Sequence, residues 1–454
     1  MTTRHAVAKH ALITGPVAET ADDRAVVLEP YAVDRIPTYD YVQEEYLVSG
    51  TAAGDPYSTR VLVRRPADMA LYTGRALAEV SHIWGGNSVW RAFNRQIMRG
   101  GFMWIGIDSQ APSALDLVKG RNERRYADMT FTPGELAGDF AASIPFTEDP
   151  TPEVLARQYD EFKERWWRAT PQSFDIIAQV ANTLREGLPG LPEAAVETLL
   201  FSGISQTGGV VRRFVERYHG HLRRPGGGPV FDGYLPGASG GPALPDVDVP
   251  VMEVLGEAEF QSVRWACGVS GQVRGLTHRR PDSAVFRLYE VAGMAHRETR
   301  YMSDLDRERL RDCPLPEGAR WSSFPNSFVY NALLELLSGW ARGELVPPGS
   351  RLLETVGDTD TLARDARGNA LGGLRTTYTD APLSRLVAAT PVGRPSWYHG
   401  NETPLAEDDL VRLYGDADGY RRVHSRVADR MVGEGFLVAE DAEALRLGAE
   451  QVTF

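Results

Sequence analysis

The stretch Gly203-Ile204-Ser205-Gln206-Thr207-Gly208-Gly209 follows the apolar run Ala195–Gly203 and precedes Val210–Tyr218, which has the pattern of a helix. This order predicts a buried strand, a tight turn and a helix. A serine on such a turn is lifted above the sheet, and the first N–H groups of the helix point toward negative charge developing beside it. Thr207 stands where the simple G-x-S-x-G pattern has its last glycine, so the stretch alone fits a glycine-rich turn equally well.

Strands and helices alternate on both sides of this turn. Near-continuous apolar runs such as Phe102–Asp108 are typical of strands buried on both faces of a parallel sheet. The pattern predicts an α/β protein in which helices flank a mostly parallel central sheet. The other predicted strands are Ala76–Trp84, Val230–Leu235, Val249–Leu255 and Ala284–Val291, and the predicted helices are Val89–Gly100, Ser173–Glu186 and Ser327–Arg342.

The chain is predicted to divide into a core of residues 1–345 and a C-terminal extension of residues 346–454 packed on it. A polar insertion at about residues 109–171 interrupts the core, and its helix carries Trp166 and Trp167. Loops at the carboxyl ends of parallel strands build ligand sites, so we expect the insertion and residues 346–376 to cover Ser205 as a cap. A β-rich N-terminal part precedes the alternating region, and helical runs end the chain: Ala11–Pro16, Arg24–Pro30, Tyr41–Gly50 and Thr59–Arg65, then Glu407–Gly433 and Glu440–Glu450.

A histidine and two acidic residues follow the late strands. The strand Val249–Leu255 is followed by Glu257 and Glu259, and the strand Ala284–Val291 is followed by His296. This is the order serine, acid, histidine of α/β-hydrolases, so the chain is predicted to have the α/β-hydrolase fold. Ser205 is thus the candidate nucleophile, His296 its general base, and a glutamate the group that orients the imidazole. The spacing from Gly256 favours Glu259 over Glu257, and both stay candidates.

An oxyanion hole needs two donors. The backbone N–H of Gln206, the residue after the nucleophile, is the first candidate. The second is the N–H of Trp84 or Gly85, in the loop His82–Asn87 after an early strand, where glycines permit close approach of the backbone to a substrate.

The charge and composition of the chain narrow the classes of partner that the protein is expected to bind. The net charge of −12 argues against nucleic acid and against anionic membrane surfaces. No apolar stretch is long enough for a secretory signal or a membrane span, so a cytoplasmic location is expected. The two cysteines are far apart and the run Tyr218–His221 has no third ligand nearby, so neither a metal nor a cofactor is expected. The sequence leaves a homo-oligomer open.

Several segments together resemble a family known as "alpha/beta hydrolase domain-containing protein". The resemblance runs from about residue 60 to the C-terminus and implies ester hydrolysis without naming a substrate. It also implies that the C-terminal part belongs with the core, because a late segment without a role in the triad matches as well. The matching segments are Ala78–Gly86, Arg99–Ile107, Ser173–Ile176, Gly203–Gly208, Pro250–Glu259, Tyr289–His296 and Arg367–Thr376.

The leading functional hypothesis is hydrolysis of a small-molecule carboxylic ester or lactone through an acyl-enzyme formed on Ser205. A second hypothesis keeps the same three residues but passes the acyl group to an alcohol or amine, as an acyltransferase or cyclase does under a dry cap. A third is a non-catalytic ligand-binding protein on a hydrolase scaffold, and the presence of Ser205, His296 and a glutamate argues against it.

Overall fold

The computed structural model describes most of the chain, in two compact units. The described residues are 6–7, 9–29, 35–83, 86–132, 161, 164–260, 276–302, 307–308, 310–311, 313–357, 359, 361–389 and 399–454. The first unit comprises Met1–Gly237 and Leu244–Val251, and the second comprises Ala238–Ala243 and Met252–Phe454. The predicted boundary at residue 345 stays a prediction.

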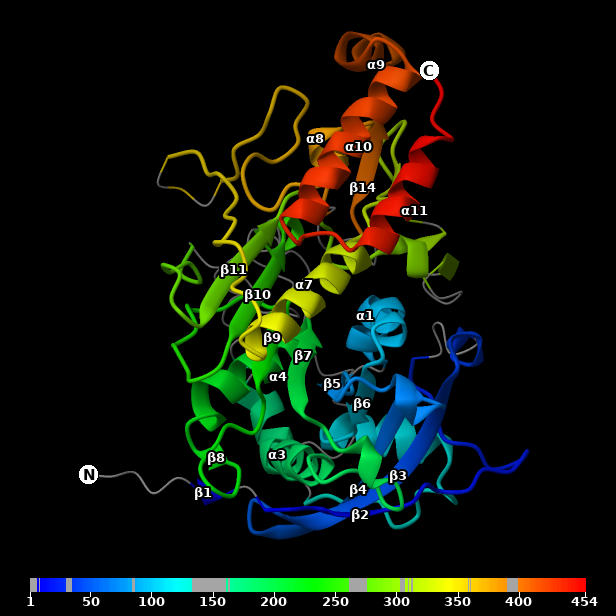
Figure 1. The fold of residues 1–454 in the computed structure, drawn as a ribbon, viewed down its shortest axis with the longest axis vertical. Helices are drawn as coiled ribbons and strands as arrows, with labels where there is room; N and C mark the ends of the chain where they lie inside the picture. The colour runs from blue at the N-terminus through cyan, green and yellow to red at the C-terminus, as the bar shows by residue number, and fades with distance from the viewer. Residues whose placement is uncertain are drawn as a thin grey trace. The chain divides into compact units, whose positions relative to one another are not determined.

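The first unit is built on a twisted sheet with the strand order β9-β7-β5-β6-β4-β3-β2 (Figure 1). The strands β9, β7, β5 and β6 run parallel, whereas β4, β3 and β2 join antiparallel and form the predicted β-rich N-terminal part. Three helices connect the parallel strands and pack on the sheet. The strands are β2 Leu12–Thr14, β3 Tyr41–Ala52, β4 Asp55–Pro66, β5 Arg75–Val80, β6 Met103–Ile107, β7 Thr198–Ile204 and β9 Gly233–Gly237, and the helices are α1 Ser88–Arg99, α3 Ser173–Leu184 and α4 Gln206–Arg213. The predicted α/β fold class is confirmed.

One predicted strand, Arg24–Pro30, is wrong for residues 24–29, which form no strand. Two of the backbone donors there bond to side chains. The N–H of Ala25 donates to Glu19 Oε1 at 3.0 Å, and the N–H of Val26 donates to Tyr126 Oη at 2.9 Å. A short apolar run predicts a strand only when a partner strand is available for it.

A buried carboxyl group joins three elements of the first unit. Glu79 on β5 accepts hydrogen bonds from the backbone N–H groups of Val89 and Trp90 at the start of α1, at 3.1 and 2.7 Å, and from Trp104 Nε1 on β6 at 2.8 Å. Arg64 on β4 lies over the rings of Trp90 and Trp104, at 4.1 and 4.4 Å from their centroids. Burial raises the pKa of Glu79 to about 8 and lowers the pKa of Arg64 to about 9.

The stability of the protein is therefore expected to fall with rising pH through Glu79. The unfolded carboxyl group titrates near 4.5, whereas the folded one keeps its proton to about 8. The stabilising contribution is complete below the unfolded pKa and is lost as the pH rises through the folded pKa, by up to about 1.4 kcal/mol per pH unit. Glu79→Gln should flatten this slope in urea denaturation between about pH 5 and pH 8. The exposed Glu193→Gln should keep the wild-type slope, and a Glu79→Gln protein that kept it too would contradict the prediction.

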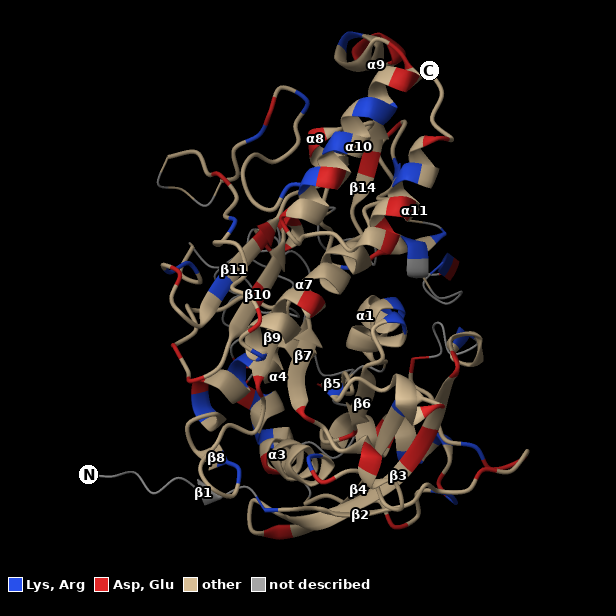
Figure 2. Ribbon diagram, in the orientation of Figure 1, with Lys and Arg blue, Asp and Glu red and all other residues tan. Residues whose placement is uncertain are grey.

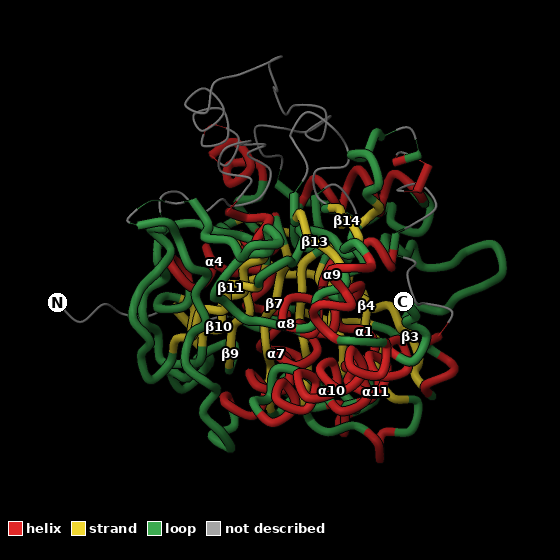
Figure 3. Tube along the Cα trace, turned by 90° about the horizontal axis from the view of Figure 1, so that it is seen from above, coloured by secondary structure: helices red, strands yellow, loops and turns green. Residues whose placement is uncertain are grey.

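The second unit combines two neighbouring buried strands, a long buried helix, a small antiparallel sheet and three C-terminal helices. Helices α10 and α11 pack side by side (Figure 3), and Figure 2 shows basic and acidic residues interspersed along them. The elements are β10 Val251–Gly256, β11 Phe286–Val291, α7 Asn326–Ala341, the small-sheet strands β12 Arg320–Trp321, β13 Ser384–Val387 and β14 Asn401–Pro404, the short helix α8 Thr377–Asp380, and the helices α9 Glu407–Tyr414, α10 Ala417–Gly433 and α11 Ala439–Ala449.

The predicted helical run Glu407–Gly433 is interrupted between α9 and α10. Gly415 has a φ of 80°, which ends α9, and the side chain of Asp416 accepts a hydrogen bond from the N–H of Gly419 at 2.6 Å, which caps α10. Glycine often ends a helix and aspartate often begins one. The prediction of a single helix followed the continuous amphipathic pattern and overlooked these two residues. No helix among the described ranges is long and apolar enough to cross a membrane.

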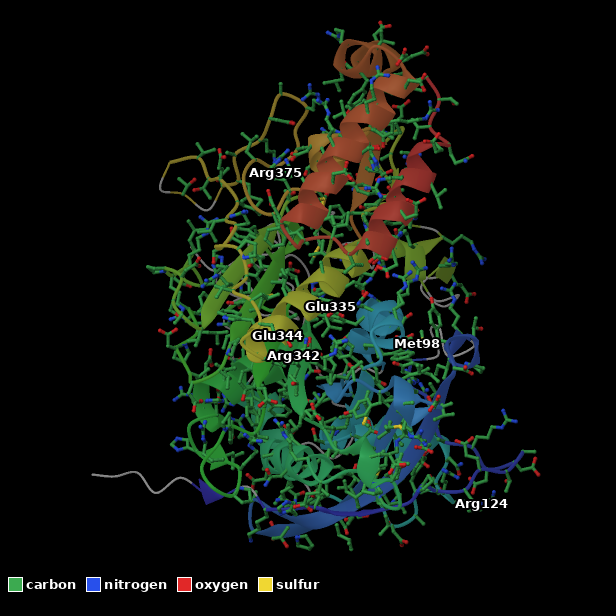
Figure 4. All side chains as sticks on the ribbon, viewed as in Figure 1. Met98, Arg124, Glu335, Arg342, Glu344 and Arg375 are labelled. Atoms are coloured by element: carbon green, nitrogen blue, oxygen red, sulfur yellow. The ribbon has the colours of Figure 1, made fainter. Side chains whose placement is uncertain are left out.

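The late segment Arg367–Thr376 pairs with β11. The N–H of Leu374 donates to the carbonyl of Glu290 at 2.7 Å, and the N–H of Ala292 donates to the carbonyl of Leu374 at 3.2 Å. Arg375, which is labelled in Figure 4, belongs to this segment. Its guanidinium group donates to the carbonyls of Ala370 and Thr379 at 2.7 and 2.9 Å. The segment thus fixes the point at which β11 ends and the loop carrying His296 begins.

Candidate active site

Ser205 occupies a strained turn between β7 and α4 in the first unit. Its backbone angles are φ 63° and ψ −122°, a region that residues other than glycine rarely adopt. Such a conformation costs on the order of 1–3 kcal/mol and persists only where the surroundings impose it. Gly203 is required beside it, since a Cβ at that position would lie 2.2 Å from the carbonyl oxygen of Thr207.

Backbone and side-chain hydrogen bonds hold the turn on both sides. The N–H of Ser205 donates to the carbonyl of Gly237 on the neighbouring strand β9 at 2.9 Å, and its carbonyl accepts from the N–H of Gly209 at 3.0 Å. The hydroxyl of Thr207 accepts from the N–H of Ile204 at 2.9 Å and donates to the carbonyl of the same residue at 3.0 Å. Thr207 therefore closes the turn by its side chain, which accounts for its presence where the simple motif has glycine.

His296 and Glu259 form a buried pair in the second unit. Glu259 Oε1 lies 2.7 Å from His296 Nδ1, and Glu259 Oε2 accepts from the N–H of Gly256 at 2.5 Å. Glu259 is 1% exposed and His296 is 7% exposed. A carboxylate fixed at both oxygens holds the imidazole in one orientation with the proton on Nδ1, so that Nε2 is left as the basic nitrogen.

Glu257, the other candidate acid, is bonded elsewhere. Its Oε2 accepts from the N–H of Gly293 at 2.8 Å, and its Oε1 accepts from Arg364 Nη2 at 2.7 Å. Gly293 has a φ of 78° in the loop between β11 and His296. The structure thus brings Glu259 to His296, while Glu257 fixes the loop and the segment that carries Arg364.

One of the candidate oxyanion donors, Gln206, lies among the described residues. Gln206 is the first residue of α4, so its N–H is at the helix N-terminus. Trp84 and Gly85 lie outside the described residues. The described part of their loop is joined to the turn, because the N–H of Ile83 donates to Gln206 Oε1 at 3.2 Å, and the loop closes through a bond from the His82 N–H to the Gly86 carbonyl at 3.1 Å.

Described residues of the insertion predicted at 109–171 lie close to the nucleophile turn. A Cβ on Gly209 would lie 3.6 Å from the Trp166 indole, and the Trp166 and Trp167 rings stack at 3.7 Å between centroids. Ser205 is 9% exposed. Trp166 of the insertion thus lies beside α4. The predicted cap over Ser205 stays a prediction, for the insertion as for residues 346–376.

The family described as "Alpha/beta hydrolase domain" matches residues 13–446. The chain belongs to this alpha/beta hydrolase family. The match confirms the resemblance found in the sequence, and it includes the Ser205 turn, the His296–Glu259 pair and the late segment that pairs with β11.

Solved structures similar to this alpha/beta hydrolase include several esterases. A candidate dienelactone hydrolase from Klebsiella pneumoniae subsp. pneumoniae MGH 78578 is 13% identical, with 51% of this chain and 84% of that chain covered and a TM-score of 0.25. A siderophore hydrolase from Aspergillus nidulans is 14% identical, with 54% and 73% covered and a TM-score of 0.26. A glucuronoyl esterase from Solibacter usitatus is 9% identical, with 55% and 71% covered and a TM-score of 0.25. The comparison with curated proteins finds no match.

Two residues of the hydrolase that the sequence did not single out lie at this pair, and one of them supports the loop of His296. Asn326, at the start of α7, donates through Nδ2 to the carbonyl of Ala295 at 2.7 Å and so anchors the residue before His296. Burial and the nearby Glu259 carboxylate raise the pKa of Tyr330, on the next turn of α7. The sequence predicted the helix Ser327–Arg342, but a helix pattern does not indicate which loop the helix will contact.

Proposed function

We propose that this alpha/beta hydrolase cleaves a small-molecule carboxylic ester or lactone through an acyl-enzyme on Ser205. The observation that carries the proposal is the strained backbone of Ser205, between a buried strand and a helix N-terminus. A folded chain keeps a serine in this costly conformation when the exposed direction of its hydroxyl matters for function. The buried pair of His296 and Glu259 supplies the matching base and orienting acid.

In the proposed mechanism, Ser205 Oγ attacks the carbonyl carbon of the ester while its proton passes to His296 Nε2. The carbonyl oxygen becomes an oxyanion, which accepts hydrogen bonds from the N–H of Gln206 and from the N–H of Trp84 or Gly85. The tetrahedral intermediate collapses, the bond to the alcohol oxygen breaks, and His296 returns the proton to that oxygen. A water molecule then repeats the sequence on the acyl-enzyme, releasing the acid and restoring Ser205.

Glu259 acts in this mechanism through His296. Its carboxylate, held by the N–H of Gly256, accepts the Nδ1 proton and stabilises the imidazolium that forms in each half-reaction. Glu257 has no such part, because its two oxygens bond to Gly293 and Arg364.

A fluorophosphonate label and a short p-nitrophenyl ester test the proposal together. We expect one phosphonyl group per chain, mapped by mass spectrometry to the peptide containing Ser205, and loss of ester hydrolysis in step with labelling. The phosphonyl group mimics the acyl group on the serine oxygen. Labelling at another residue, or hydrolysis that persists in fully labelled protein, would exclude Ser205 as the nucleophile.

A further inference from the structure

A buried glutamine joins the three elements that surround the nucleophile turn in the first unit. Gln110 follows β6 and is 1% exposed. Its Nε2 donates to the carbonyl of Ser81 at 2.8 Å and to Gln206 Oε1 at 3.3 Å. Its Oε1 accepts from Gln206 Nε2 at 2.9 Å and from Trp166 Nε1 at 2.8 Å. One side chain thus contacts the loop after β5, the residue after the nucleophile and the helix of the insertion.

Further hydrogen bonds hold the loop after β5, at Ser81 and at Ile83. Gln206 Oε1, which Gln110 holds, also accepts the N–H of Ile83 at 3.2 Å. The hydroxyl of Ser81 donates to Asp108 Oδ1, and Asp108 Oδ2 accepts from Arg60 Nε at 2.6 Å. Trp84 and Gly85 directly follow this anchored part of the chain.

Burial makes this arrangement costly to change. Ser81, Asp108, Gln110 and Gln206 are each 3% exposed or less. In such a low-dielectric environment a donor or acceptor that loses its partner is not rescued by water. A single set of hydrogen bonds therefore fixes the loop relative to the N-terminus of α4.

We propose that Gln110 is a positioning residue: it holds Gln206, whose N–H is the first candidate oxyanion donor, against the loop at Ser81 and Ile83, and it couples this geometry to Trp166 of the insertion. The proposal rests on the proposed esterase function for its catalytic consequence. Stabilisation of an oxyanion depends on donors that are already in place before the charge develops.

Gln110→Glu tests the proposal with a nearly isosteric change. A carboxylate still accepts from Trp166 and Gln206 Nε2 but cannot donate to the carbonyl of Ser81, and its second oxygen faces Gln206 Oε1. We expect kcat to fall by about 10²-fold, as for an active site misplaced by about 1 Å, with KM changed less than about threefold. The affinity for a boronic acid, which mimics the tetrahedral intermediate, should fall with kcat/KM.

Gln179→Glu is the matched control. Gln179 is also buried, donates to the carbonyl of Thr51 at 2.9 Å and accepts from the hydroxyl of Tyr57 at 3.0 Å. It therefore loses the same kind of bond at the β3–β4 hairpin. We expect a similar loss of thermal stability in both variants, but reduced kcat and boronate affinity in Gln110→Glu alone. Equal kcat in the two variants, per site titrated with fluorophosphonate, would overturn the proposal.

Amide hydrogen exchange separates this proposal from the proposed function. The N–H of Ile83 should exchange faster in Gln110→Glu than in the wild type, and at the wild-type rate in Gln179→Glu. This readout needs no turnover, so a wild type without esterase activity would refute the function while the exchange still tests the role of Gln110. Unchanged exchange in Gln110→Glu would overturn the positioning role. Gln110→Met, which keeps the volume of the side chain but removes its hydrogen bonds to Ser81, Gln206 and Trp166, should speed exchange as well and serves if Gln110→Glu does not fold.

Discussion

Ser205→Ala is expected to lower kcat for ester hydrolysis by about 10⁴- to 10⁶-fold, because alanine has no hydroxyl with which to form the acyl-enzyme. The melting temperature should stay within a few degrees of the wild type, since alanine suffers the same backbone strain at φ 63°. Stopped-flow and steady-state assays with a p-nitrophenyl ester measure the loss.

Ser202→Ala is the control for that substitution. Ser202 lies on β7, the strand that leads into the turn, is fully buried, and donates through its hydroxyl to the carbonyl of Leu235 at 2.9 Å. This variant should lose stability and keep kcat. Turnover by purified Ser205→Ala above the uncatalysed rate by more than the residual binding effect of about 10³–10⁴ would reject the nucleophile. Ser205→Gly should be equally inactive yet more stable, because glycine relieves the strain.

Glu259→Gln is the second large effect, with kcat expected to fall by about 10⁴-fold. The amide can donate to His296 Nδ1, which places the ring proton on Nε2, where the proton of Ser205 has to go. Since Oε2 of Glu259 also holds the N–H of Gly256, some thermal stability should be lost as well.

Glu257→Gln is the matched comparison, two residues away in the same helical turn. It weakens the ion pair with Arg364 and should lower stability, while kcat falls less than about tenfold. The ratio of the two kcat values, measured on protein titrated for active sites, decides between the glutamates. A larger loss in Glu257→Gln would give the orienting role to that residue.

The sequence predicted the parts of the site that depend on local order along the chain. The buried strand, the glycines and the turn at Ser205 are neighbours in sequence, so their pattern alone predicts the strand-turn-helix geometry. His296 and the acidic pair were found because each follows a predicted strand, and parallel strands place their carboxyl ends together.

What the sequence did not predict depends on contacts between distant residues. Glu257 and Glu259 share one helical turn, and the sequence favoured Glu259 without excluding Glu257, because the bonds that hold Glu257 join it to Gly293 and Arg364, far away along the chain. Gln110 lies in a polar segment without a motif, and its partners are about 29 to 96 residues away. The small sheet of β12, β13 and β14 was missed because strands of two to four residues show no alternation.

The pairing of β11 with the late chain also bears on how this protein can be shortened. Besides Leu374, Arg351 bonds to β11, through its N–H to the carbonyl of Leu288 and through its carbonyl to the N–H of Glu290, at 3.0 and 2.8 Å. A fragment ending after α7 would strip these partners and leave β11 as an open edge strand. Its free N–H and C=O groups would then recruit strands from other molecules, so such a fragment should aggregate even where its own core still folds.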